Sequence, residues 1–98
     1  MQYPIAIDWG DERYATGIVF PDIPGAITAG DTVEQAYEMA VEAAHIMLEH
    51  LLENGEPIPL PGRITDHREN PDYEGWGWDT IEIDITPYLI EPEKNTPQ

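Results

Sequence analysis

The chain has 98 residues, no cysteine and a formal net charge of −16, because 20 Asp and Glu stand against four Lys and Arg. This length suits one domain with a single modest core, and a chain without cysteine forms neither disulfides nor a Cys-based zinc site. Nucleic acids and anionic membranes are bound through lysines and arginines, which are scarce here. We therefore expect no direct contact with nucleic acid or membrane. Basic proteins or cations are the expected partners, unless the acidity serves solubility only.

No apolar run is long enough to span a membrane, and no signal-peptide pattern is present, so we expect a cytoplasmic protein. Residues 2–9 alternate in polarity, which predicts a strand with one buried face, and Pro4 indicates an edge position or the strand's first residues. A polar turn leads to a second predicted strand at 14–20, which should pair antiparallel with the first. Two prolines and a glycine end that strand before a short third strand at 26–29.

The longest predicted element is an amphipathic helix of about 22 residues between Gly30 and Gly55. Thr32 and Gln35 have the spacing of a capping box, and Gly55 can adopt the left-handed conformation that ends helices. Apolar residues recur at three- and four-residue spacing, at Val33, Ala36, Tyr37, Ala40, Ala43, Ala44, Met47, Leu48, Leu51 and Leu52. The opposite face carries Glu34, Glu38, Glu42, His45, Glu49 and Glu53. Such a stripe needs a partner surface, and we expect a sheet.

After the helix, alternating prolines at 56–62 predict an extended covering segment, and 64–70 predicts a short helical turn. Residues 78–86 alternate again and predict a fourth strand with Ile81, Ile83 and Ile85 on one face. From Pro87 onward no period remains, so we expect a mobile tail. The order predicts an α+β fold, β-β-β-α-β, with a small antiparallel sheet and one long helix packed on it. We take residues 1–89 as the domain and 90–98 as a tail, with no separate DNA-binding domain.

Few residues have the pattern of a catalytic or metal site. His45 could join Glu42 and Glu49 in a helical metal site, but a solvated face is the commoner meaning of that spacing. His50 and His67 have no comparable neighbours in the sequence. Strand carboxylates Asp8 and Asp84, with Glu38, are the ingredients of a two-metal nuclease only if they converge. Serine, cysteine and a phosphate-binding loop are absent from the sequence, so we expect no enzyme, no metal and no cofactor.

The large aromatic side chains near the C-terminal strand have two interpretations. They are Tyr73, Trp76, Trp78 and Tyr88. Burial in the core is the commoner fate of such residues. The alternative is an exposed anchor for a protein partner, since Trp and Tyr in acidic surroundings often mark an interface.

Residues 20–44, FPDIPGAITAGDTVEQAYEMAVEAA, resemble the signature of the HicB antitoxin family: PD-x-PG, a short strand, a GDT helix start and an acidic, alanine-rich helix. YPIAID, GEPIPLP and WDTIEIDITPYL are similar to the family's first strand, post-helix segment and last strand, so the resemblance covers roughly residues 3 to 89. It implies an incomplete RNase H-like fold without the nuclease's catalytic acids. It also implies a partner, the small basic RNA-cleaving HicA toxin, whose active-site histidine the antitoxin covers.

Many members of that family continue into a helix-turn-helix or ribbon-helix-helix domain that binds their own promoter, and they are commonly dimers or larger. Too few residues follow Leu89 for either domain. We expect either a short single-domain version or the loss of a DNA-binding region, and in both cases no autonomous operator binding. A homo-oligomer, dimer or tetramer, is expected. The alternatives to an antitoxin are an orphan homo-oligomeric scaffold or regulator and a metal-dependent nuclease.

Exposed charge and aromatic residues, rather than the resemblance, suggest two toxin-binding surfaces. The hairpin surface comprises Asp8, Trp9, Asp11 and Glu12, and the loop surface comprises Glu74, Trp76 and Trp78. The motif residues should hold the fold through bends, backbone freedom and a helix cap. They are Pro21, Asp22, Pro24, Gly25, Gly30, Asp31 and Thr32.

Overall fold

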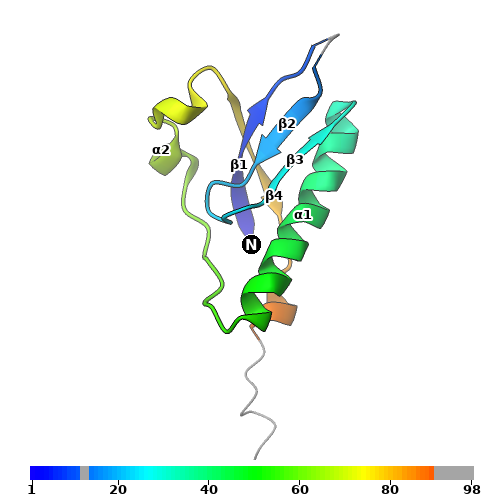
Figure 1. Cartoon of the computed structure of the whole chain (residues 1–98). Coiled ribbons are helices and arrows are strands. Elements are labelled where there is room, and N and C mark those ends of the chain that lie inside the picture. Colours follow the sequence, from blue (N-terminus) through cyan, green and yellow to red (C-terminus); the bar gives the residue numbers. More distant parts are fainter. Residues whose placement is uncertain (12–13, 90–98) are drawn as a thin grey trace, which may run out of the picture.

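The computed structural model describes residues 1–11 and 14–89. In chain order the elements are β1 (Gln2–Asp8), β2 (Thr16–Val19), β3 (Ile27–Gly30), α1 (Val33–Glu53), α2 (Ile64–His67), the 3₁₀ helix η1 (Pro71–Tyr73), β4 (Gly77–Glu82) and the 3₁₀ helix η2 (Thr86–Tyr88) (Figure 1). The sheet is antiparallel, with the order β3-β2-β1-β4. Because α1 connects the two edge strands across one face, the predicted α+β crossover is confirmed. None of the described helices has the length and apolar character needed to cross a membrane.

β1 is an inner strand, so the edge position inferred from Pro4 is wrong, whereas its place near the strand's start is right. Pro4 pairs with Thr80 of β4, but the pairing of β1 with β2 begins at Ala6, opposite Val19. If the same register continued by two residues toward the N-terminus of β1, Pro4 would lie opposite Pro21, and neither proline has an N–H to donate. The two prolines therefore end the β1–β2 ladder and leave β4 as the partner of the first half of β1.

The limits of α1 agree with the predicted signals. The Thr32 hydroxyl accepts the Gln35 N–H at 3.0 Å, as expected of an N-cap. The Gln35 side-chain oxygen accepts the N–H of Asp31 at 2.8 Å, so the reciprocal bond reaches one residue beyond the N-cap. At the other end Gly55 has φ +70, the left-handed conformation that terminates the helix.

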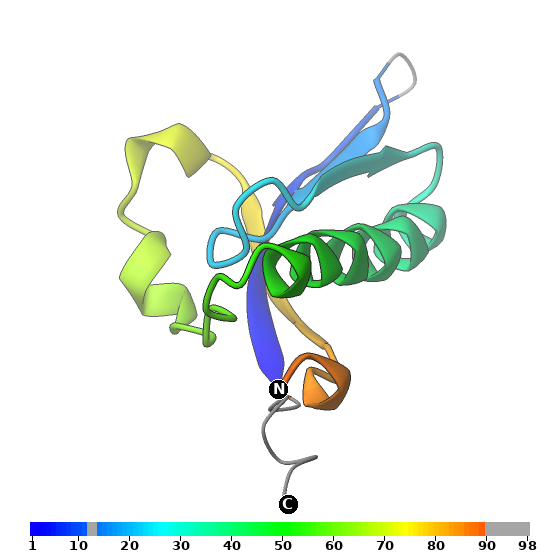
Figure 2. The ribbon, with the colours of Figure 1, turned by 60° about the horizontal axis from the view of Figure 1, so that its bottom comes forward.

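The core lies between α1 and the sheet. Small residues on the buried face of α1 let it approach β3 and β2 closely, and Figure 2 shows α1 running alongside β3. The buried residues of α1 are Ala36, Ala40, Ala44 and Leu48. The strands contribute Tyr3, Ile5, Ile7, Ile18 and Ile81, with Phe20, Ile23, Ile83 and Ile85 from the adjoining segments. Sheet and helix thus bury each other's apolar faces, as the helix pattern required.

β1 is buried on both faces, whereas its alternation predicted one buried face. Pro4 and Ala6 are buried along with Tyr3, Ile5 and Ile7. Ala6 faces Trp78 across the β1–β4 ladder, and the Trp78 ring is stacked on His67 of α2, with centroids 6.5 Å apart. The segment that carries α2 and η1 therefore covers part of the sheet on the side away from α1 (Figure 2). The sequence predicted that residues 56–62 form a covering segment. In the structure residues 67–78 also contribute to this covering.

The predicted fourth strand ends early, and part of the predicted mobile tail is ordered. β4 stops at Glu82, because the Ile83 N–H bonds to the Met1 carbonyl at the start of β1, where the ladder runs out. Thr86–Tyr88 then forms η2, and the Tyr88 hydroxyl lies 2.7 Å from Nδ1 of His45 on α1. The expectation of a mobile tail from Pro87 is therefore wrong as far as Leu89. The expected tail at 90–98 lies outside the described residues.

Candidate functional site

The hairpin surface stands at the end of β1. Asp8 is the last residue of β1 and is exposed, and the Trp9 side chain is 55% exposed, unusually high for an indole. Asp11 accepts the Tyr14 N–H on its carboxylate at 2.9 Å and donates its own N–H to the Tyr14 carbonyl, which closes the turn. Glu12, predicted to belong to this surface, lies outside the described residues.

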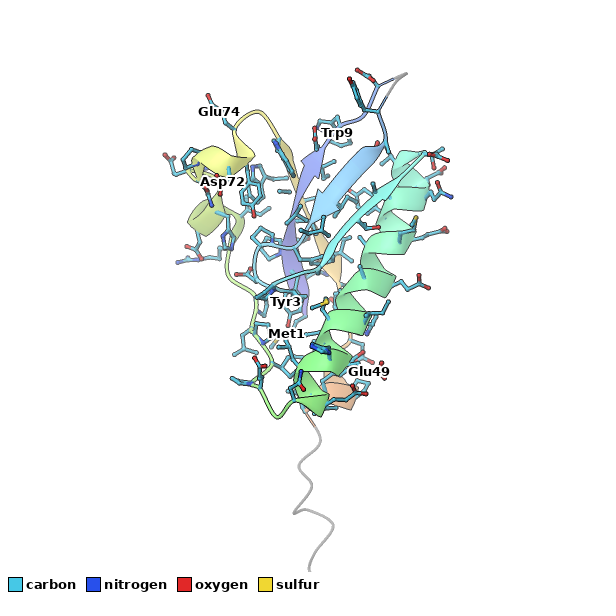
Figure 3. The ribbon with its side chains drawn as sticks, viewed as in Figure 1. Met1, Tyr3, Trp9, Glu49, Asp72 and Glu74 are labelled. Carbon is cyan, nitrogen blue, oxygen red and sulfur yellow. The ribbon has the colours of Figure 1, made fainter. Side chains whose placement is uncertain are left out.

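The loop surface is built from aromatic rings in mutual contact. Tyr73 makes edge-on contacts with Trp76 and Trp78, at centroid distances of 5.4 and 5.5 Å. Glu74 is exposed next to them, at the turn between η1 and β4 (Figure 3). All three rings are half-buried, so each has both packed and exposed surface, and a role as an anchor for a protein partner stays a prediction. Such contacts are worth about 0.5–1.5 kcal/mol beyond area burial and fix the rings' orientation.

The two predicted surfaces lie at the same end of the sheet in the folded chain. β4 begins at Gly77, which pairs with Ile7, two residues before Trp9. A Cβ added to Gly77 would lie 2.6 Å from Nε1 of Trp9, so the indole rests directly on that glycine. Figure 3 shows Trp9 and Glu74 at the same end of the sheet. We call this region the aromatic end: Asp8, Trp9, Asp11, Glu74, Trp76 and Trp78.

Asp22 of the PDIPG motif links two distant segments. Its carboxylate accepts the Gly62 N–H at 3.0 Å and lies 3.0 Å from Nε2 of His67. His67 in turn stacks on Trp78, so Asp22 orients the base of the loop surface. The sequence offers His67 no partner of this kind at near spacing, and the fold supplies Asp22. No sequence pattern could reveal this pair, since 45 positions separate the two residues.

The remaining motif residues have local backbone roles in the structure. Gly25 has φ +85, a conformation that side-chain-bearing residues rarely adopt, and Met47 of α1 packs against it. Gly30 is needed for close approach, because a Cβ there would lie 2.5 Å from the Ala36 backbone nitrogen. Pro21 is the second residue of the turn closed by the bond from the Ile23 N–H to the Phe20 carbonyl, and Pro24 is the second residue of the next turn, closed by the bond from the Ala26 N–H to the Ile23 carbonyl. A fold-holding role for this motif is consistent with these contacts and stays a prediction.

Burial and hydrogen bonds shift the pKa values of two residues, Tyr37 and Asp84. Burial, and then the hydrogen bond to Asp79 at 2.8 Å, raise the pKa of Tyr37 to about 12. Bonds from Thr86 lower the pKa of the Asp84 carboxyl and hold it ionised. Neither group is poised to exchange protons near neutral pH, so neither has the character of a general acid or base.

The acidic residues considered for a nuclease do not converge. Ile83 bonds to Met1, so Asp84 lies beside the start of β1, whereas Asp8 lies at its other end. Seven residues of strand separate the two positions, roughly 23 Å at about 3.3 Å per residue. A two-metal centre needs carboxylates around ions about 4 Å apart. Asp8 and Asp84 therefore cannot be ligands of the same two-metal centre.

The fold also gives a different partner to His45, the candidate metal ligand of α1. His45 is half-buried, and its Nδ1 bonds the Tyr88 hydroxyl, so the solvated-face interpretation is wrong for this residue. The imidazole packs against η2, with ring centroids 5.8 Å apart. Among residues 1–11 and 14–89, no group of three or more His, Asp or Glu side chains is placed to hold a metal ion.

The family of the chain follows from its similarity to known proteins. Residues 3–96 match the profile of the HicB-like antitoxins of bacterial toxin–antitoxin systems. Antitoxin HicB 1 of Photorhabdus laumondii is 44% identical over 64 residues, which are 65% of this chain and 41% of that protein. The chain thus spans less than half of that antitoxin.

Solved structures agree with this similarity. The N-terminal domain of the Burkholderia pseudomallei antitoxin HicB has a TM-score of 0.71 at 29% identity and covers 86% of this chain and 99% of that one. A chain of the HicA3 and HicB3 toxin–antitoxin complex has the same TM-score and coverage at 31% identity. The chain described here belongs to the HicB-like antitoxin family of bacterial toxin–antitoxin systems.

Proposed function

We propose that this chain neutralises a small, basic, RNA-cleaving toxin of the HicA type by covering the toxin's active site, and that it has no enzymatic activity of its own. The observation that carries the proposal is the aromatic end, where exposed carboxylates surround partly exposed indoles. Aromatic residues are the usual anchors of protein interfaces, and the surrounding charge selects a basic partner. The proposal requires no cofactor and no metal. It places the chain in the cytoplasm, where such a toxin meets its RNA.

The charge of the whole chain supports this choice of partner. The formal net charge is −16, and the arginines among the described residues are Arg63 and Arg68, both close to α2. Within that same part of the chain, the five glutamates of α1 form no ion pair. Such a surface speeds encounter with a cationic protein and repels nucleic acid, so a basic protein is the partner that it selects.

The proposal is tested with the product of the small basic reading frame that should neighbour this gene. We expect a complex of nanomolar affinity, suppression of RNA cleavage at equimolar ratio, and binding that weakens as salt is added. The full chain without the toxin should leave RNA intact in Mg²⁺ or Mn²⁺. Absence of a complex would refute the antitoxin proposal, and RNA cleavage by the purified chain would refute the non-enzymatic one.

A pair of charge-matched variants locates the contact surface. Asp8→Asn with Glu74→Gln removes two negative charges from the aromatic end. Glu49→Gln with Glu53→Gln removes two from the far half of α1, and Figure 3 shows Glu49 well away from Trp9 and Glu74. We expect the first variant to weaken toxin binding roughly three- to tenfold and the second much less. Equal effects would mean that only the overall field matters and that the contact lies elsewhere.

We also propose that copies of this chain associate through β3. β3 is an edge strand without a charged residue, and the exposed Ile27 side chain belongs to it. Exposed Met39 and Ile46, seven residues apart on one helical face, add apolar surface on α1, which packs along β3. The opposite edge, β4, carries Asp79 and Glu82, and edge charges oppose pairing with an identical strand. In a two-fold dimer each edge faces its own copy, so β3 is the edge that permits self-pairing.

A further inference from the structure

An open pocket of about 450 Å³ lies beside the aromatic rings of the loop surface. Tyr73, Trp76 and Trp78 form its aromatic wall. Arg68, Glu69 and Glu74 also line it, and all three side chains are exposed. This combination of ring faces with two carboxylates and a single cation occurs in a chain of formal net charge −16. We name this cavity the aromatic pocket.

The wall of the pocket is held in place before any ligand arrives. Trp78 is supported on one side by the stacked His67 ring, which Asp22 bonds at 3.0 Å, and Tyr73 contacts it edge-on at 5.5 Å. The Asn70 side chain accepts the Asp72 N–H at 2.9 Å and caps η1, and Gly75 turns the chain with φ +83. A preformed wall spares a ligand the cost of ordering these rings, so the pocket favours binding over collapse.

The chemistry of the pocket favours a cation. The faces of indole and phenol rings carry negative electrostatic potential, and a guanidinium or ammonium group placed over them is attracted. Glu69 and Glu74 add full negative charges at the rim, whereas an anion would face both of them with only Arg68 in compensation. A planar guanidinium can stack on an indole and donate charge-assisted hydrogen bonds to a carboxylate in the same pose, whereas a neutral isostere lacks the charge that strengthens both contacts.

We propose that the aromatic pocket receives an arginine side chain of the basic partner, stacked on Trp76 and neutralised by Glu74. The inference depends on the proposed antitoxin function only for the identity of the chain that supplies the arginine. Arg68 places a positive charge at the pocket, so its removal takes away a charge that repels the incoming guanidinium. The preference of the pocket for a cation can therefore be measured without the toxin.

The probe is the peptide acetyl-Gly-Arg-Gly-amide, with its citrulline counterpart as the neutral isostere, titrated into the full chain at constant ionic strength. The three tryptophan indole N–H signals report by NMR. We expect the arginine peptide to shift the indole signals of Trp76 and Trp78 until the shift saturates, and to leave the signal of Trp9 nearly unchanged. The citrulline peptide at equal concentration should shift none of the three signals. Equal shifts from the two peptides would overturn the assignment of a cation. Shifts spread over all three indoles would mean a general field effect and would also overturn it.

Two arginine variants separate the pocket from overall charge. Arg68→Gln and Arg63→Gln each remove one positive charge, but Arg63 does not line the pocket. We expect Arg68→Gln to tighten peptide binding about two- to fivefold and Arg63→Gln to change it little. Trp76→Leu, checked for an unchanged backbone spectrum, should remove saturable binding. Equal tightening by both arginine variants, or unchanged binding by Trp76→Leu, would refute the proposal. A toxin that fails to bind the wild-type chain would refute the antitoxin proposal instead.

Discussion

At the scale of single residues, the hydroxyl groups of two tyrosines connect the sheet to α1 and to the segment that follows α1. Tyr3 donates to the Pro59 carbonyl at 2.6 Å and so holds the segment after α1 against β1. Tyr37 donates to Asp79 at 2.8 Å and joins α1 to β4, the one strand that is farthest from β3. Burial is the larger cause of the raised pKa in both, followed by the charge of Asp22 for Tyr3 and by Asp79 for Tyr37.

These shifts predict a loss of stability at alkaline pH. The folded pKa of Tyr37, about 12, exceeds its ordinary value of 10.0, so folding favours the neutral phenol. The stability that this provides is complete below pH 10.0 and is lost as pH rises toward about 12. We expect the urea midpoint to fall across this window and to fall less in Tyr37→Phe, which cannot ionise there. Tyr14→Phe, at a side chain 68% exposed, serves as the control and should keep the wild-type decline. Identical declines in all three proteins would contradict the assignment.

At the scale of elements, the contact of α1 with β3 depends on the absence of side chains. Gly30 ends β3 against the first turn of α1, and an added Cβ would lie 2.5 Å from the Ala36 nitrogen and 2.8 Å from its Cα. Both atoms are backbone within a capped helix, so no rotamer change relieves the contact. The alanines of α1 then continue this close approach along the helix. The short Gly30–Thr32 connection works because the strand and the helix are already nearly in contact.

Gly30→Ala is therefore expected to destabilise the fold. Overpacking of a close contact costs about 1–3 kcal/mol, in addition to any shift of α1 relative to β3. Gly17→Ala is the matched control within the same sheet, because its Cβ would lie 3.7 Å from the nearest atom. Chemical denaturation of the two variants should separate them by at least about 1 kcal/mol. A Gly30→Ala protein as stable as Gly17→Ala would contradict the close approach.

At the scale of the whole molecule, charge is distributed unevenly over surfaces that could bind other chains. The β4 edge and the exposed face of α1 are acidic, whereas β3 is uncharged. The aromatic end lies at the end of β1 where the β1–β2 hairpin and the start of β4 meet (Figures 1 and 3). Self-association at β3 and toxin binding at the aromatic end would then use separate surfaces, so the oligomer could bind its toxin without dissociating.

The proposed use of β3 predicts that one added charge makes the chain monomeric. Ile27→Lys places a cation on an edge side chain that is already 65% exposed, so the fold should tolerate it. In a two-fold dimer the two lysines would approach each other, which opposes pairing. We expect sedimentation to show an oligomer for the wild type and a monomer for Ile27→Lys. Thr80→Lys makes a similar change on the exposed β4 edge and should leave the oligomer intact. A monomeric wild type would refute the proposal, as would equal behaviour of the two variants.

Local sequence signals determined the elements themselves. Thr32, Gln35 and Gly55 mark the ends of α1 because caps act through hydrogen bonds to their own near neighbours. The alternation of Ile81, Ile83 and Ile85 identified three buried residues, although only Ile81 lies within β4. Charged and aromatic residues suggested the two candidate surfaces for a related reason. The members of each surface are close together in the sequence, so their composition can be read directly.

Only the tertiary structure decided which distant residues meet. The pairs Asp22 with His67, His45 with Tyr88 and Tyr37 with Asp79 join positions 42 to 45 residues apart. Trp9 rests on Gly77, the residue between Trp76 and Trp78, so two surfaces predicted separately lie at the same end of the sheet. No periodicity encodes such contacts, because they depend on strand order, register and the path of α1 across the sheet. The sequence determined the secondary-structure elements and their charge, and packing determined that the indoles and carboxylates gather at one end of the sheet.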